Sequence, residues 1–301
     1  MLNLRGIRAR EARAFYLFIT PWALGFLIFT IGPILASFYY SFTRYDIMSP
    51  PTFVGLGNFQ ELFSDPLFYK SMANTLYFVV LVVPLSMILS FALALLLNQQ
   101  VRGLPVYRTI YYLPSIVPFV ASSILWMWLL QPQFGLVNGA LRSLGVSNPP
   151  TWLASETWAK PALILIMLWG SGSTMLIYLA GLQGVPQSLY EAAEIDGASR
   201  LSRFRHITLP MMTPTLFFTL TMGIISTFQV FTIVYVVTAG MGGPLDSTLV
   251  YLLYLFRQGF VYFRMGYASA MALVLFVIIL IITFVQFALA PIWVYYEIER
   301  R

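Results

Sequence analysis

The chain has 301 residues, of which 59% are apolar, 17% aromatic and only 9% charged, with a net charge of +6. A soluble globular protein carries about 25% charged residues, and one soluble core of this size could not hide so much apolar surface. The composition therefore excludes an ordinary soluble enzyme, a disordered chain and a protein that binds nucleic acid. The absence of cysteine and the single histidine, His206, exclude disulfides, thiol catalysis and Cys- or multi-His metal sites.

Six stretches of the sequence contain no Asp, Glu, Lys or Arg, and each exceeds the roughly 20 residues that cross a ~30 Å hydrocarbon core. They are continuously apolar rather than alternating, which favours membrane helices over a β-barrel. The first is too long for a cleaved signal peptide. We predict transmembrane helices at residues 15–40, 73–97, 109–130, 161–182, 213–238 and 267–292. They form one membrane domain, residues 15–292, between a cytoplasmic segment, 1–14, and a cytoplasmic tail, 293–301.

The Lys and Arg residues are distributed unevenly about these spans. Eleven of the seventeen lie at the two termini and in the second and fourth loops, and six lie in the other loops. The positive-inside rule therefore places both termini and the fourth loop in the cytoplasm. A further charge-free stretch, residues 247–256, is too short to span a membrane, and we expect it to be buried or re-entrant.

The fourth loop, residues 186–210, reads as a structured cytoplasmic element. Ser188 with Glu191 three residues later is a capping-box pattern that predicts a helix start, and Gly197 is the expected stop. The apolar face of a second short helix is expected at Leu201, Phe204 and Ile207. Such a helix–glycine–helix element can dock into a groove on a partner. An equally weighted alternative is a solvated loop in which Glu191 only caps its own helix and the arginines face lipid headgroups.

The same loop carries the pattern Glu-Ala-Ala, three residues, Gly, nine residues, Ile-x-Leu-Pro. All its fixed positions are present, at Glu191, Ala192, Ala193, Gly197, Ile207, Leu209 and Pro210. With this motif the chain resembles the permease subunits of binding-protein-dependent ABC importers, and most of all the maltose- and multiple-sugar-type branch. Supporting stretches include FVGLGNF at 53–59, STFQVF at 226–231 and GYASA at 266–270. The chain lacks the folded external insertion of the larger maltose-type subunits and is similar to the compact six-span members.

The resemblance implies an all-α integral membrane protein with six transmembrane helices and the type I ABC importer permease fold. It implies a location in the cytoplasmic (inner) membrane and a complex with a second homologous permease subunit, two copies of a cytoplasmic ABC ATPase and an external or periplasmic sugar-binding protein. The chain itself would be no enzyme and would hold no cofactor, because the ATPase binds ATP and Mg. The implied ATPase-coupling residues are Glu191, Ala192, Ala193, Asp196, Gly197, Ile207, Leu209 and Pro210.

The fourth and fifth spans flank this loop, and the resemblance implies that they hold the solute path. Helical spacing places its candidate residues on two helix faces: Trp169, Gly170 and Ser173, and Met222, Ser226 and Gln229. Aromatic faces and neutral hydrogen-bonding groups suit a sugar, although Ser and Gln also join membrane helices to one another. Residues 240–244 and 247–256 are the expected external contacts with the binding protein.

The predicted spans contain no ionisable side chain, which argues against proton coupling and favours a neutral sugar over an anionic solute. The sequence has no G-x-x-x-x-G-K-[ST] phosphate loop, so energy would enter through another polypeptide. Two alternatives stay open. The same machine could carry a polyol or glycerol phosphate, or, less in keeping with the motif, the chain could be a gradient-driven secondary carrier.

Overall fold

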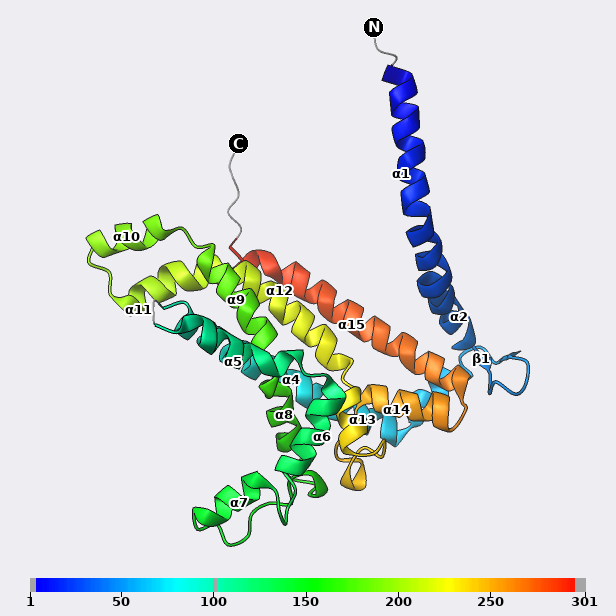
Figure 1. Cartoon of the computed structure of the whole chain (residues 1–301). Coiled ribbons are helices and arrows are strands. Elements are labelled where there is room, and N and C mark those ends of the chain that lie inside the picture. Colours follow the sequence, from blue (N-terminus) through cyan, green and yellow to red (C-terminus); the bar gives the residue numbers. More distant parts are fainter. Residues whose placement is uncertain (1–3, 100–101, 296–301) are drawn as a thin grey trace. The chain divides into compact units, whose positions relative to one another are not determined.

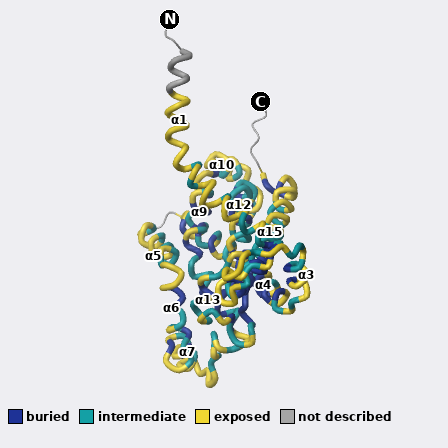
Figure 2. The backbone as a smooth tube through the Cα atoms, turned by 90° about the vertical axis from the view of Figure 1, so that its right-hand side faces the viewer, coloured by how far each residue is buried: buried dark blue, intermediate teal, exposed yellow. Residues whose placement is uncertain are grey.

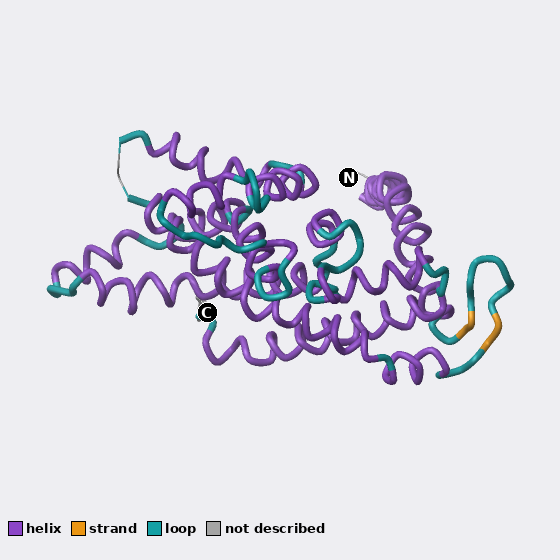
Figure 3. The backbone as a smooth tube through the Cα atoms, turned by 90° about the horizontal axis from the view of Figure 1, so that it is seen from below, coloured by secondary structure: helices purple, strands orange, loops and turns teal. Residues whose placement is uncertain are grey.

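The computed structural model describes residues 4–99 and 102–295. Its secondary structure is almost wholly helical (Figure 1), as the apolar runs predict. Two short strands, β1 (Thr43–Arg44) and β2 (Thr52–Phe53), pair antiparallel on the two arms of one loop (Figure 3). The chain divides into two compact units, Met1–Asp65 with Leu255–Val277 and Pro66–Tyr254 with Ile278–Arg301.

The first unit contains the N-terminal helices, the strand pair and the beginning of the last helix. Its helices are α1 (Leu4–Phe26), the π-helix η1 (Leu27–Ile31), α2 (Gly32–Tyr40), α3 (Gly57–Ser64), the π-helix η5 (Arg257–Val261) and the first part of α15 (Met265–Trp293). The side-chain amide of Asn58 donates to the carbonyls of Ser41 (2.9 Å) and Thr43 (2.8 Å). A Cβ at Gly266 would overlap the Thr43 carbonyl oxygen. Asn58 and Gly266 therefore serve packing in this unit.

The second unit is built around α4 (Pro66–Leu97), which contacts α8, α9 and α12. Its other helices are α5 (Leu104–Ile116), α6 (Phe119–Leu129), α7 (Leu136–Ser143), η2 (Trp152–Ala154), α8 (Ala159–Trp169), α9 (Gly172–Gln183), α10 (Gln187–Ile195), α11 (Arg200–Arg203), the π-helix η3 (Phe204–Thr208), α12 (Leu209–Phe228), α13 (Thr232–Val237), η4 (Pro244–Asp246) and α14 (Tyr251–Phe256). One core cluster joins α4, α9 and α12 through Ala94, Leu97, Met175, Tyr178, Leu179, Leu182 and Met212. Exposed residues dominate α1, α5 and α7 (Figure 2), as expected of surfaces that face lipid or a partner.

Four helical segments are long and apolar enough to cross a membrane: Glu11–Tyr40, Pro66–Leu97, Arg200–Val237 and Met265–Trp293. Two bent helix pairs, α5 with α6 and α8 with α9, bring the number within the described residues to six if each pair is one span. The prediction of a six-span helical membrane protein agrees with this count. The predicted second span begins too late, since α4 starts seven residues earlier, at Pro66.

Three of the six predicted spans are broken. α5 and α6 meet at 99° because Pro118 has no N–H and pushes Val117 into an extended conformation (φ −69°, ψ 129°). α8 and α9 bend by 48° at Gly170 and Ser171. The fifth span stops at Phe228 and resumes at α13. At the breaks, turns replace the regular hydrogen bonds of the helix, and the N–H groups of Val117, Gly170 and Gln229 each donate to the carbonyl three residues back. Such irregular backbone is tolerated in a membrane-spanning segment where it is buried in protein or lines a cavity.

Candidate functional site

The loop at residues 186–210 forms a helical hairpin around α10. The predicted capping box is wrong: Pro186 is the N-cap residue, no side chain caps the helix, and Ser188 lies inside its first turn. The fixed φ of proline (−59° at Pro186) starts the helix earlier than a serine cap would. Gly197 is confirmed as the stop. It has φ +75°, and the N–H groups of Gly197 and Ala198 donate back to the carbonyls of Glu194 (3.0 Å) and Ala193 (2.8 Å), which is a Schellman turn.

The second half of the loop is continuous with the fifth span. Ser199 is its N-cap and accepts a hydrogen bond from the Ser202 N–H at 3.2 Å. α11, the π-helix η3 and α12 then follow without a break, so the separate second short helix that we predicted is absent here. Leu201 is 75% exposed, whereas Phe204 and Ile207 are half-buried. The wider π turn changes the angular spacing of side chains, so residues three apart no longer share one face.

The predicted coupling residues separate into two groups. Exposed positions on α10 and its turn hold Glu191, Ala192, Asp196 and Gly197, with Ala193 half-buried among them. Ile207 lies in η3, and Leu209 and Pro210 begin α12. Two apolar side chains that were not among the predicted coupling residues project from the same hairpin, Ile195 (88% exposed) and Leu201. Large apolar residues set among charged ones in a cytoplasmic loop are the signal that could have identified them.

The loop that precedes α14 is held to the N-terminal part of α4 by hydrogen bonds. The side-chain amide of Asn74 donates to the carbonyls of Asp246 (3.0 Å) and Leu249 (2.9 Å), and Thr75 Oγ1 accepts from the Tyr251 N–H (2.9 Å). Residues 249–251 are fully buried, in agreement with the expected buried segment, so they offer no surface to a partner. Residues 240–244 include Met241, which is 72% exposed.

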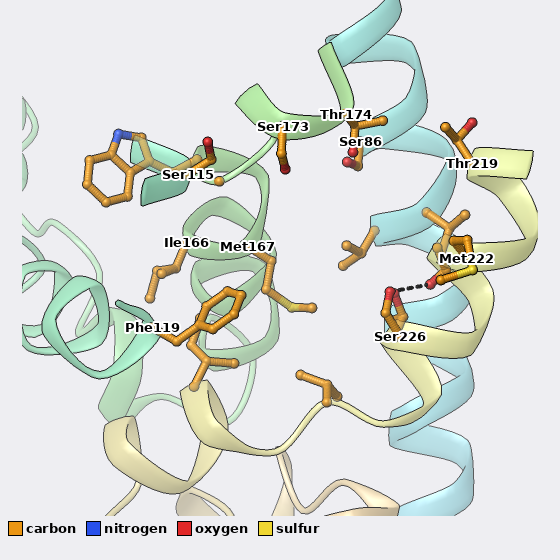
Figure 4. A pocket seen from close by; sticks show the side chains of 18 of the residues that line it. Ser86, Ser115, Phe119, Ile166, Met167, Ser173, Thr174, Thr219, Met222 and Ser226 are labelled. Atoms are coloured by element: carbon orange, nitrogen blue, oxygen red, sulfur yellow. Dashed lines mark hydrogen bonds between the residues drawn. The ribbon is translucent and has the colours of Figure 1, made fainter. Parts of the chain in front are cut away.

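A cavity of about 530 Å³ lies between α4, the α5–α6 break, the α8–α9 break and the α12–α13 break (Figure 4). All six predicted path residues line it: Trp169, Gly170, Ser173, Met222, Ser226 and Gln229. Their expected placement on two continuous helix faces is wrong, because Gly170 lies between α8 and α9 and Gln229 follows the last residue of α12. The three broken spans thus supply the cavity with irregular backbone.

The lining of the cavity is uncharged and mostly apolar, with hydroxyl and amide groups set among the apolar side chains. Among the described residues that line it there is no Asp, Glu, Lys, Arg or His. Ser226 donates to the Gly223 carbonyl at 3.1 Å (Figure 4), whereas the side chains of Ser173 and Gln229 make no hydrogen bond with the described part of the chain. Trp169 packs edge-on against Trp126, with ring centroids 5.9 Å apart. Such a lining can present hydroxyl, amide and aromatic groups to a neutral polar solute.

Sequence reasoning missed the contribution of the second and third spans to this cavity. Further lining residues from these spans and from α9 and α12 are Ser86, Ser115, Phe119, Thr174 and Thr219. Serines inside predicted apolar spans were the available signal, although a serine also serves as an interhelical contact. Over the described ranges, no group of three or more His, Cys, Asp or Glu residues could hold a metal ion.

Comparison with known proteins identifies the family. Residues 86–293 match the family model described as "Binding-protein-dependent transport system inner membrane component". The probable ABC transporter permease protein YesP of Bacillus subtilis is 44% identical over 303 residues, covering 100% of this chain and 97% of the relative. The lactose transport system permease protein LacF of Rhizobium radiobacter is 35% identical, covering 90% and 92%.

A solved structure has the same fold. It is a bacterial ABC transporter involved in the import of the acidic polysaccharide alginate; the matched chain has a TM-score of 0.84 and 24% identity, and the match covers 96% of this chain and 99% of that one. The family model covers more than half of the present sequence. The chain therefore belongs to the multi-pass inner-membrane permease components of binding-protein-dependent ABC transporters, and not to their ATPase components.

Proposed function

We propose that the chain is one of two homologous permease subunits of an ATP-driven importer that translocates a carbohydrate delivered by an external solute-binding protein. The observation that carries this proposal is the cavity: six residues chosen from the sequence as path residues line one space with hydroxyl, amide and indole groups and no charged side chain. Sugars present apolar C–H faces and a rim of hydroxyls, which such a lining complements. The lactose permease named above supports a sugar cargo by similarity.

The proposed coupling surface is α10 with the turn that follows it. Glu191, Ala192, Ala193, Asp196 and Gly197 would contact the ATPase directly. Ile207, Leu209 and Pro210 would hold the base of the hairpin at the start of α12. We add Ile195 and Leu201 as apolar anchors, because buried apolar side chains supply most of the affinity of a helix seated in a groove. ATP binding by two ATPase copies would draw the two coupling helices together and turn the cavity from inward- to outward-facing.

The proposed orientation places both termini and α10 in the cytoplasm, on the side that carries eleven of the seventeen Lys and Arg residues. The loop at residues 240–244 would then lie on the external side, where the exposed Met241 is available to the binding protein.

Two measurements test this function. The first is co-purification of the chain from mild detergent with an ABC ATPase and a second permease subunit. Isolation of the chain alone, active in gradient-driven uptake, would favour a secondary carrier instead. The second is a thermal-shift screen of the partner binding protein against neutral oligosaccharides, polyols and glycerol phosphate. We expect an oligosaccharide to raise the melting temperature of the binding protein. A response confined to glycerol phosphate or a polyol would overturn the sugar assignment, but it would not contradict the assignment as an ABC importer.

A further inference from the structure

A partly buried hydroxyl pair joins α10 to the start of α12. The Tyr190 hydroxyl and Thr208 Oγ1 share a hydrogen bond of 2.8 Å across 18 residues of sequence. Thr208 is only 6% exposed, and Tyr190 is half-buried. A hydrogen bond shielded from water holds its two partners in one geometry more strictly than an exposed one, since water cannot replace either partner without cost.

The other links between α10 and α12 are weaker or more flexible. Arg203 pairs with Glu194 at 3.2 Å, but the Glu194 side chain is 73% exposed, and exposed ion pairs contribute little. The covalent connection runs through the turn at Gly197, a residue with wide conformational freedom. The Tyr190–Thr208 bond is therefore the shielded polar contact that sets the position of α10 against α12.

A second hydroxyl pair, near the cavity, joins α9 to α12. The Tyr178 hydroxyl on α9 and Thr219 Oγ1 on α12 lie 2.6 Å apart, and Tyr178 is fully buried. The ring of Phe91 packs against both Tyr178 (5.4 Å between centroids) and Phe204 of the coupling hairpin (6.2 Å). Thr219 itself lines the cavity, one turn before Met222. The two hydroxyl pairs thus link α10 and α9 to α12, which extends from the coupling surface to the cavity wall.

We infer that Tyr190 and Thr208 are positioning residues that make α10 and α12 move as one body, so that displacement of α10 by the ATPase reaches the cavity wall. The inference rests on the proposed function, because it assigns these residues a part in ATPase coupling. Neither residue is a fixed position of the motif from which coupling residues were predicted, since Tyr190 directly precedes it and Thr208 occupies its variable position. Without their bond, a displacement of α10 is absorbed by rotation at Gly197 and by loss of the exposed Glu194–Arg203 pair.

The test uses the complete transporter in proteoliposomes with its binding protein, and compares Tyr190→Phe and Thr208→Val with wild type. Each variant deletes one hydroxyl and keeps the shape of the side chain. We expect normal ATPase co-purification and normal basal ATP hydrolysis, with solute transported per ATP lowered about fivefold, the factor that one neutral hydrogen bond contributes to an equilibrium. Thr208→Ser keeps the hydroxyl and should restore the wild-type ratio. The double variant should be no worse than either single one, because both remove the same bond.

The matched control is Tyr107→Phe, which removes an exposed hydroxyl that has no hydrogen-bond partner in the described part of the chain. A wild-type transport ratio in Tyr190→Phe and Thr208→Val would overturn the inference. The inference would also be overturned if the variants gave less folded complex, and therefore less transport, while the solute transported per ATP stayed at the wild-type value. Failure of the wild-type chain to bind an ATPase would instead refute the proposed function, which keeps the two failures distinct.

Discussion

The packing of α5 against α9 leads to a sharp prediction for Gly172, the first residue of α9. A Cβ at this position would overlap the carbonyl oxygen of Tyr111 and lie 2.9 Å from the Cα of Tyr112. Both are backbone atoms of α5, so no side-chain rotation relieves the overlap. An ordinary carbon–carbon separation is 3.5–4.0 Å, so Gly172→Ala should move the two helices apart by roughly 1 Å. Overpacking of this kind costs about 1–3 kcal/mol.

The displacement should also disturb transport, because α5 supplies Ser115 to the cavity and α9 supplies Ser173. We expect a lower melting temperature of the purified transporter and a lower rate of solute uptake per folded complex. Gly139→Ala in α7 is the control, because a Cβ there meets nothing within 4 Å. Alanine should stabilise that helix by about 0.5–1 kcal/mol. Wild-type melting and uptake in Gly172→Ala would refute the close approach of α5 and α9.

Three further predictions concern the coupling loop, the cavity and the loop that precedes α14. Glu191→Lys should leave membrane insertion intact but lower transport-linked ATP hydrolysis about tenfold or more, as expected for a reversed charge in an interface; unaltered hydrolysis would remove Glu191 from the coupling surface. Trp169→Ala and Gln229→Ala should raise the KM for uptake about two- to tenfold while the ATPase still co-purifies, and wild-type kinetics would take both residues off the path. Asn74→Leu should destabilise the folded transporter by about 1–3 kcal/mol, because it removes the donor to the carbonyls of Asp246 and Leu249. An unchanged melting curve would contradict the role of Asn74 in holding this loop.

The spans could be predicted from the sequence because hydrophobic length alone determines which segments can cross a membrane. Their breaks could not be predicted, because residue identity does not fix the outcome. Pro84 lies within the continuous helix α4, whereas Pro118 separates α5 from α6 at 99°. In a bundle, neighbouring helices can satisfy the groups that a proline releases, and which prolines have such neighbours depends on the tertiary structure.

The parts of the candidate site that depend on residues close together in the sequence were predictable. The stop at Gly197 depends on one turn of chain, and the motif predicts the hairpin that contains it. The cavity is different, because it joins segments far apart in sequence. Ser86 and Phe119 line it only because α4 approaches α9 and α12 while α6 approaches α8 and α13, and helical periodicity does not determine which helices meet.

The central claim is that the cavity carries solute under the control of a separate ATPase, and uptake into proteoliposomes tests it most directly. Vesicles would contain the chain with its partner permease and ATPase subunits, and would receive the loaded binding protein outside and ATP inside. The account predicts sugar uptake that requires both ATP and the binding protein and that falls in the Trp169→Ala variant. Uptake by the chain without ATPase subunits, driven by an ion or solute gradient, would contradict it.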